Sequence, residues 1–235
     1  MRVTVITPSI RKDRLELVRK ALKNQLFTDF EWIICSPFNP NIPEASWIKD
    51  DFEGGFWSLN RAYASLIGNS AGDIIVSWQD SIWAKPDALQ RFVRAVDATG
   101  GVVSGVGDQY DHLDEFGKPV EKVWSDPRRN DKFGSLYECT FPDCEYNFCA
   151  FPVDLINKIG GIDIKMDHLG FGMDMYQVSD RLNDFGAKFY LDQENESFSL
   201  FHGREHKEWD EKHLMHGGYE ARKQELKAQN RWPVI

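Results

Sequence analysis

The sequence predicts an α/β fold in which a mainly parallel sheet is flanked by helices. Short apolar runs alternate with amphipathic stretches through the first half of the chain, and this βα rhythm favours parallel strands with covering helices. The run at residues 31–36 is also apolar throughout its middle, as an interior parallel strand should be. A chain of 235 residues buries enough surface to fold unaided, as one large domain or two small ones.

The first predicted elements follow in order from the N-terminus. Residues 3–7 form the first strand. Asp13 is placed to cap the helix that follows, because apolar residues then recur on one helical face. Residues 31–36 form the second strand, and a loop rich in proline and asparagine comes after it.

Two helices and two strands complete the first half. A Gly-Gly pair introduces a helix over residues 57–68, and residues 74–78 form the third strand. Pro86 opens a helix that continues through Val96, since proline is favoured in a first turn. Residues 101–106 form the fourth strand.

The second half is more polar. Residues 108–145 are rich in turn formers, contain a predicted hairpin and are expected to border a cleft. Residues 147–163 predict a strand, a short helix and a Gly-Gly stop. A helix is predicted over residues 174–185, followed by the strand KFYL. The tail, residues 207–230, is predicted to be a surface helix broken at its Gly-Gly pair.

Charge and composition argue against several classes of function. A formal net charge of -9 and a pI near 5.2 disfavour nucleic acid and anionic membranes as partners, because both reward clustered lysine and arginine. No stretch reaches the roughly 18 apolar residues of a membrane span, and no signal peptide is visible, so we expect a cytoplasmic protein. The four cysteines are expected to be reduced thiols, because disulfides are rare in the cytosol. A zinc site is not expected, because their spacing lacks the tight pairs of a zinc site.

Three loops are expected to share one edge of the sheet. In open α/β sheets, ligands collect beyond the carboxyl ends of the strands. The loops TPSIR, SPFNP and QDS follow the first three predicted strands. Asp80, in the last of these loops, should therefore face a ligand crevice.

Five segments, taken in order, resemble the glycosyltransferases of family 2, which have the Rossmann-like GT-A fold. The segments are TVITPSIRKDRLELVRKALKNQ, FEWII, SLNRAYA…AGDIIVSWQDSIWAKPDAL, NFCAFPVDLINKIGGID and GFGMDMYQVSDRL, and the resemblance covers residues 3 to about 206. It implies a hexosyltransferase-like enzyme that moves a sugar from a nucleotide-sugar donor, most simply a UDP-sugar, to an acceptor hydroxyl. It also implies a nucleotide-sugar-binding half at 1–106, an acceptor-binding and catalytic half at 107–206 and a helical tail at 207–235.

The resemblance implies a Mg²⁺ or Mn²⁺ ion at Asp80. The family's Asp-x-Asp motif, which carries the metal, matches Gln79, Asp80 and Ser81, so one carboxylate is retained. Mg²⁺ is commonly held by one or two carboxylates when substrate phosphates complete its ligands. His202 resembles a late histidine that joins the metal in some relatives, and an imidazole would favour Mn²⁺. Alternatively, Asp80 caps the turn before Pro86, and His202 is an ordinary loop histidine.

The resemblance also implies which residues hold the donor. The nucleoside and the diphosphate are expected against the loops that follow the first strands. The expected donor-binding residues are Thr7, Pro8, Ser9, Arg11, Arg14, Ser36, Asp51, Asn60, Gln79 and Asp80. Ser36 and Pro37 replace the aspartates that commonly recognise the base in the family, so the base stays open. Asp50 is an alternative to Asp51 for contacts with the base or the ribose.

Asp174 is expected to be the catalytic base of an inverting transfer, which takes the proton of the acceptor hydroxyl. It matches the second acid of a Glu-Asp pair in the family. A carboxylate at a helix N-terminus stays ionised because the helix dipole stabilises the anion, but an N-cap needs the same residue type at the same place. Asp143, Glu145 and Asn147 are expected on the acceptor side, where short polar groups orient sugar hydroxyls.

Two rival functions stay open. A nucleotidyltransferase uses a related scaffold, although TPSIRKDR lacks the glycines of its usual phosphate loop. A non-catalytic binding module would explain the acids missing from the family motifs. Four tryptophans either stack on a sugar or base or belong to the core: Trp57, Trp78, Trp83 and Trp124.

Overall fold

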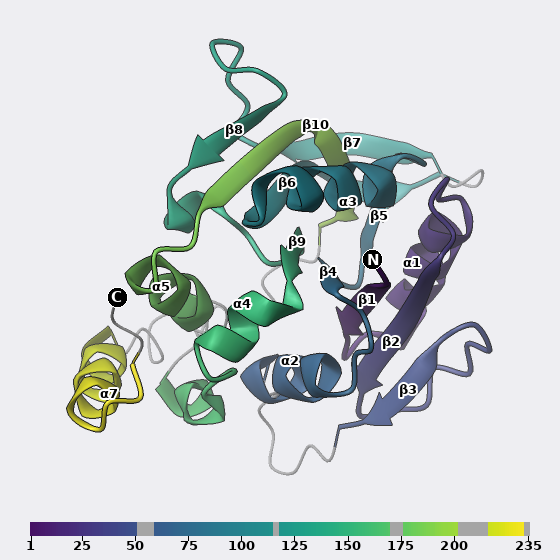
Figure 1. Ribbon diagram of the computed structural model, residues 1–235. Helices are drawn as coiled ribbons and strands as arrows, with labels where there is room; N and C mark the ends of the chain where they lie inside the picture. The colour runs from purple at the N-terminus through teal and green to yellow at the C-terminus, as the bar shows by residue number, and fades with distance from the viewer. Residues whose placement is uncertain (51–58, 115–117, 170–175, 202–215, 233–235) are drawn as a thin grey trace.

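A mixed sheet forms the centre of the computed structural model, which describes residues 1–50, 59–114, 118–169, 176–201 and 216–232 (Figure 1). The strand order is β3 (Ser46–Lys49), β2 (Phe30–Ser36), β1 (Val3–Pro8), β4 (Ile74–Trp78), β9 (Phe148–Pro152), β6 (Val102–Leu113), β10 (Phe189–Leu200) and β5 (Ile82–Ala84). β7 (Pro119–Ser125) pairs with β6, and β8 (Leu136–Cys139) pairs with β10.

The sheet is mainly parallel. Parallel pairing joins β3 to β2, β2 to β1, β1 to β4 and β6 to β10. Because β9 runs antiparallel to both β4 and β6, these two neighbours of β9 share one direction, which is also that of β1, β2, β3 and β10. The predicted α/β class with a mainly parallel sheet is confirmed.

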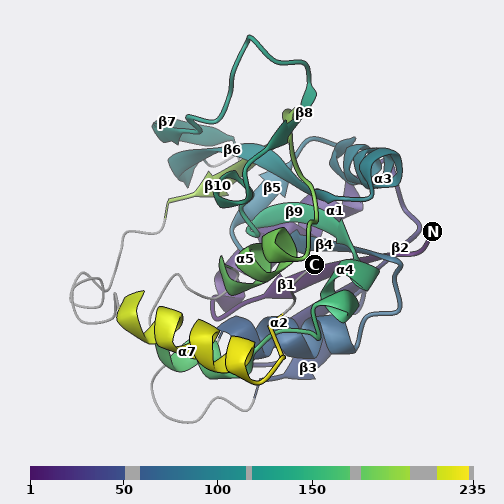
Figure 2. The same ribbon diagram turned by 60° about the vertical axis from the view of Figure 1, so that its left-hand side comes forward.

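Helices cover both faces of the sheet (Figures 1 and 2). One face carries α1 (Leu15–Lys23) and α3 (Ala88–Thr99), and the other carries α2 (Leu59–Gly68), α4 (Val153–Lys158) and α5 (Tyr176–Asp184). Three short 3-10 helices are η1 (Lys12–Arg14), η2 (Phe141–Asp143) and η3 (Ile164–Leu169). The last helix, α7 (His216–Ala228), lies against η3.

Strand side chains alternate between two apolar clusters. In β4, Ile74 and Val76 pack with α1 and α3, whereas Ile75 points to the side of α2 and α4. Val5 and Ile6 divide in the same way in β1. This alternation follows from the pleat of a strand, and it explains why interior strands need apolar residues at every position.

Strand β9 begins at the edge of the sheet where β4 ends. Phe148, its first residue, lies opposite Trp78, the last residue of β4. An antiparallel strand therefore begins where its parallel neighbour ends. The segment that precedes β9, residues 143–147, lies next to the carboxyl end of β4 for this reason.

Most predicted elements are present with shifted boundaries. The strand at 74–78 and the hairpin of β6 and β7 are confirmed, but β6 continues to Leu113. The strand KFYL continues to Leu200, with an irregular register between Asp192 and Glu196. Sequence analysis did not identify β3, because three of its four side chains are exposed and the segment lacks an apolar run.

Three local predictions are wrong. Asp13 does not cap α1, because a 3-10 turn precedes that helix and its N-cap position is Arg14. Pro86 lies before α3, which begins at Ala88. The tail helix is not broken at its glycines, because α7 runs from His216 through Gly217 and Gly218.

Helix α7 is also docked rather than free. Its Tyr219 and Leu226 form a small buried cluster with Met166 of η3 and with Trp232. Burial of these apolar side chains holds the last helix against the domain. In the described part of the chain, every helix is too short or too polar to cross a bilayer. The division into halves at residue 106 stays a prediction.

The aromatic cluster around Phe148 gives a test of the core. The Phe148 ring lies 5.0 Å from Trp78 and 4.8 Å from Phe92, measured between centroids. Phe148→Ala should lower the free energy of unfolding by about 3–5 kcal/mol, because the cavity cannot collapse fully. Phe133→Ala, at a ring that is 52% exposed, should lower it by less than about 1 kcal/mol. Equal losses in urea unfolding would contradict this placement of the core.

Candidate functional site

The carboxyl ends of β1 and β4 meet at one edge of the sheet. The two strands are adjacent and parallel, so the residues that follow Pro8 and Trp78 lie side by side. Ser9 and Arg11 come from the first loop, and Asp80 comes from the second. We call these three residues the strand-end site.

Asp80 is held by both side chains of the first loop. The Ser9 hydroxyl donates to Oδ2 of Asp80 at 2.8 Å, and Nη1 of Arg11 donates to Oδ1 at 3.3 Å. The Ser9 hydroxyl also accepts a hydrogen bond from the Arg11 main-chain amide at 3.1 Å. The Asp80 side chain is 9% exposed and that of Arg11 is 33% exposed. An acid, a hydroxyl and an accessible guanidinium are therefore brought together by two loops that lie about 70 residues apart in sequence.

The alternative interpretation of Asp80 is that it caps the turn before Pro86. In the helix that follows this turn, α3, the first turn is capped by Gln25 from the segment after α1, because Oε1 of Gln25 accepts the Leu89 amide at 3.0 Å. Gln25 is buried and also donates to the Lys85 carbonyl at 2.9 Å. The contacts of Asp80 with Ser9 and Arg11 instead cross from β4 to β1.

Gln79 and Ser81 flank Asp80 differently. The Gln79 amide group donates to the Tyr63 hydroxyl at 3.1 Å, so this side chain is directed toward α2. Ser81 adopts a positive φ of 67°, which is uncommon for a residue with a Cβ. Its side chain is buried, and its hydroxyl has no hydrogen-bond partner among the described residues. Strain and an unpaired hydroxyl next to Asp80 are features that often accompany a functional site.

Thr7 and Pro8 are the last two residues of β1, and Thr7 stabilises this strand end through hydrogen bonds. Thr7 is fully buried; its hydroxyl donates to the Trp78 carbonyl at 2.8 Å and accepts the Trp32 indole N–H at 2.9 Å. These bonds tie β1 to both of its neighbours. Arg14 lies apart from this group, since it pairs with Asp13 at 3.2 Å.

The end of β2 carries a polar contact with β3. The Trp47 indole donates to the carbonyl and to the hydroxyl of Ser36, each at 3.2 Å. Asp50 follows β3; it is buried and accepts a hydrogen bond from Nε of Arg61 at 3.0 Å. Burial, together with the charge of Asp50, raises the pKa of Cys35 to about 12, which keeps this thiol protonated.

Asn60 joins α2 to α5. It is buried, and its Oδ1 accepts a hydrogen bond from Nε2 of Gln177 at 2.8 Å. Sequence analysis did not identify Gln177, because a glutamine in an amphipathic helix carries no distinctive pattern. Asp51, Asp174 and His202 lie outside the described residues, and so does Trp57.

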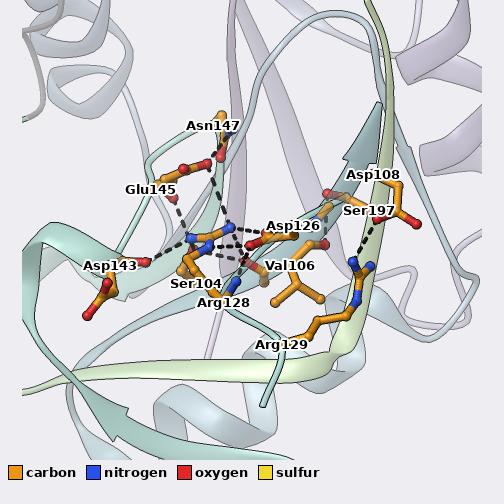
Figure 3. Close-up of polar contacts among 12 residues, drawn as sticks. Ser104, Val106, Asp108, Asp126, Arg128, Arg129, Asp143, Glu145, Asn147 and Ser197 are labelled. Atoms are coloured by element: carbon orange, nitrogen blue, oxygen red, sulfur yellow. Dashed lines mark hydrogen bonds and ion pairs between the residues drawn. The ribbon is translucent and has the colours of Figure 1, made fainter. Parts of the chain in front are cut away.

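A half-buried arginine, Arg128, lies close to Glu145. Arg128 donates to Asp126 through Nε at 2.8 Å, to the Asp143 carbonyl at 2.8 Å and to the Gly105 carbonyl at 3.2 Å (Figure 3). Its Nη2 lies 3.7 Å from Oε2 of Glu145. We call Asp126, Arg128 and Glu145 the Arg128 cluster.

Charge pairing in the Arg128 cluster shifts two pKa values. Burial alone would raise the pKa of Asp126, but the hydrogen bonds and charge of Arg128 outweigh it and hold that pKa below its usual value. Burial alone would lower the pKa of Arg128, but Asp126 and Glu145 raise it. Both groups therefore stay ionised at neutral pH. Sequence analysis missed this pair because it lies in a polar loop without strand or helix periodicity.

Glu145 and Asn147, which were expected on the acceptor side, lie beside one another (Figure 3). The Glu145 side chain is 47% exposed and accepts a hydrogen bond from Nδ2 of Asn147 at 3.0 Å. The main-chain carbonyl of Asn147 accepts a hydrogen bond from the main-chain amide of Gln79 at 3.0 Å, so Asn147 adjoins the end of β4. Asp143 differs, because its carboxylate binds Thr140 within its own turn.

The tryptophans divide between core and surface. Trp78 is fully buried in the cluster with α1 and α3, so its interpretation as a stacking residue is wrong. Trp83 is half-buried, 5.8 Å from the Phe198 ring. Trp124 is 40% exposed on β7.

The residues around Asp80 provide few oxygen ligands for a hard divalent cation. Asp80 is a single carboxylate, and the unpaired hydroxyl of Ser81 follows it directly. Oxygen ligands of this kind fit Mg²⁺ or Mn²⁺ only if a substrate supplies further oxygens. Within the described ranges, no group of three His, Cys, Asp or Glu side chains could hold a metal by itself.

Comparison with known proteins shows the fold. No protein-family model matches the chain, and no curated protein matches it. The crystal structure of residues 1–349 of Staphylococcus aureus TarS matches with a TM-score of 0.63 and 11% identity over 85% of this chain and 60% of that chain. The same protein in complex with UDP matches with a TM-score of 0.59 and 10% identity over 86% of this chain and 61% of that one. The chain thus has the same fold as these TarS structures, and it spans about 60% of their length.

The Arg128 cluster gives a test based on pH. Asp126→Asn should destabilise the protein by about 3–5 kcal/mol at neutral pH, because buried Arg128 loses its countercharge. The folded pKa of Asp126 is lowered, so its contribution is present above the unfolded pKa of about 3.9 and is lost as the pH falls through the folded value. Urea unfolding of wild type and variant should therefore differ most near pH 7 and converge below about pH 4.

The exposed residue Asp97 provides the control for this test. Asp97→Asn, on the solvent side of α3, should change the free energy of unfolding by less than about 0.5 kcal/mol at any of these pH values. A gap between wild type and Asp126→Asn that stayed constant from neutral to acid pH would show that the ion pair is not the cause.

Proposed function

We propose that this chain is an inverting glycosyltransferase that moves a hexose from a UDP-sugar to an acceptor hydroxyl with the help of Mg²⁺ or Mn²⁺. The observation that supports it most is the contact of Asp80 with Ser9 and Arg11 at the carboxyl ends of two adjacent parallel strands. Ligands of open α/β sheets bind at such an edge. A structure with this fold was solved in complex with UDP. Membership of family 2 is part of the proposal.

In this proposal, Arg11 and Asp80 act on the diphosphate of the donor. A nucleoside diphosphate leaves with growing negative charge, so positive charge must face it. The accessible guanidinium of Arg11 can donate hydrogen bonds to two phosphate oxygens at the same time. Asp80, aided by His202, is the proposed metal ligand. A bound Mg²⁺ or Mn²⁺ ion would neutralise further charge on the leaving diphosphate.

The remaining donor contacts in the proposal come from the loops around the strand-end site. Ser9 positions Asp80 directly, because its hydroxyl bridges the carboxylate and the Arg11 amide. Asn60 and Asp51 are the proposed contacts to the nucleoside. Other proposed donor-binding residues are Thr7, Pro8, Arg14, Ser36 and Gln79.

The acceptor would bind beside Glu145 and Asn147. Both carry hydrogen-bonding groups next to the end of β4, and Nη2 of Arg128 lies 3.7 Å from the Glu145 carboxylate. Asp174 is the proposed base, which accepts the proton of the attacking hydroxyl. The acceptor oxygen then forms the new bond to the sugar as the bond to UDP breaks.

A binding experiment tests the role of Asp80. Asp80→Ala should weaken the binding of UDP in the presence of Mn²⁺ by about tenfold or more, since one charge-assisted contact is worth about 1.4 kcal/mol or above. Isothermal titration of UDP with and without Mn²⁺ measures this effect. Asp97→Ala removes a carboxylate from an exposed helix face and should bind UDP as wild type does. Unchanged Mn²⁺-dependent binding by Asp80→Ala would make the metal assignment wrong.

A kinetic experiment tests Asp174. Asp174→Asn should lower the rate of UDP release from UDP-sugars by about a hundredfold or more, because a general base contributes at least that factor. UDP binding should be unchanged, which separates loss of chemistry from loss of fold. Near-normal turnover would contradict the assignment. UDP binding without any turnover by wild type would instead favour a non-catalytic binding module.

A further inference from the structure

A cavity of about 500 Å³ lies away from the strand-end site, between the end of α4, η3, α5 and α7. Figures 1 and 2 both show α7 beside this group of helices. The cavity is lined by the charged residues Lys158, Asp163, Lys165, Arg181, Arg222 and Arg231. None of the residues proposed for sugar transfer lines it.

The lining of this cavity is strongly positive. Five of its side chains are cationic and one is acidic, which leaves a net charge of about +4 in a chain whose formal charge is -9. The one acid, Asp163, already forms an ion pair with Arg222, because Nε and Nη2 of Arg222 both lie 2.8 Å from Oδ2 of Asp163. Glu225, outside the lining, also pairs with Arg222. No carboxylate in the described ranges lies within 4 Å of the charged nitrogens of the other four cations.

Arg181 is the buried member of the set. It is 4% exposed, in the middle of α5. Its guanidinium donates to the carbonyls of Gly161 and Ile159, while its Nε has no partner in the described part of the chain. Because main-chain carbonyls carry no net charge, and no carboxylate of the described residues forms an ion pair with it, this cation is buried without a direct countercharge. Such burial is unfavourable unless an anion compensates it.

The electrostatics of Arg181 point the same way. Burial lowers the pKa of Arg181, Asp163 opposes this shift, and the positive charge of Arg231 adds to it. Burial and Arg231 therefore both disfavour the charged form of Arg181. An anion bound in the cavity would offset both effects.

We propose that this cavity binds a phosphate-bearing small molecule. Arginine forks and lysine ammonium groups are the side chains that best match phosphate oxygens. A volume of about 500 Å³ exceeds that of a phosphate ion and falls in the range of small-molecule sites. Ile162, Leu226 and Trp232 add apolar wall for the organic part of the ligand. This site is separate from the proposed transfer reaction.

A titration tests the proposal directly. Inorganic phosphate and glucose 6-phosphate are titrated into the full chain by calorimetry, and the variants below identify the site at which they bind. Binding of at least one of them at millimolar concentration is expected. The double variant K158Q/R231Q should bind about tenfold more weakly for each cation removed. Both residues are exposed, so the fold should be unaffected.

A matched pair of exposed cations provides the control. K20Q/R94Q makes the same change in net charge on α1 and α3, and it should bind both probes as wild type does. Unchanged UDP binding by all variants reports an intact fold and an intact strand-end site. The proposal is overturned if wild type binds neither probe, if K158Q/R231Q binds the probes as wild type does, or if both double variants lose affinity equally. None of these outcomes depends on whether the chain transfers sugars.

Discussion

Parallel pairing of β1 with β4 is the constraint on which the candidate site depends. Because the two strands run in the same direction, the loops that follow them leave the same edge of the sheet. Ser9 and Asp80 can therefore form a hydrogen bond although 71 positions separate them. Thr7 stabilises this arrangement within the sheet, since its hydroxyl donates to the carbonyl of Trp78 and accepts a hydrogen bond from the indole of Trp32. The rigid strand ends hold the polar loops in place.

Two largely desolvated arginines, Arg128 and Arg181, show how charge is distributed in this protein. Arg128 has a fully buried carboxylate partner in Asp126, so its charge is satisfied within the fold. Arg181 is bonded to carbonyls and faces a cavity with an excess of positive charge. Desolvation opposes both charges, but only the first is compensated by an acid. This difference separates a structural ion pair from a group that favours an external anion.

The similarity to the TarS structures at 10–11% identity follows from the same physics. A parallel sheet requires apolar strands, helices on both faces and polar loops at the strand ends, and many sequences meet these requirements. Specific chemistry depends instead on a few side chains at the edge. Proteins that share this fold can therefore differ in these side chains. This chain has a single acid at the end of β4, and an arginine is bound to it.

The sequence by itself determined the class of fold, most interior strands and the position of Asp80 at a strand end. Apolar periodicity and turn residues can be recognised within short segments, without knowledge of distant contacts. The sequence did not determine that Gln25 caps α3, that α7 is docked on η3 or that Trp78 is core. Those outcomes depend on partners far away in the sequence. Only the tertiary structure brought Arg11 to Asp80, paired Arg128 with Asp126 in the edge beside Glu145, and gathered five cations around one cavity. Coulombic and hydrogen-bond contacts act over a few ångströms of space, and a chain of residues does not reveal those distances until it has folded.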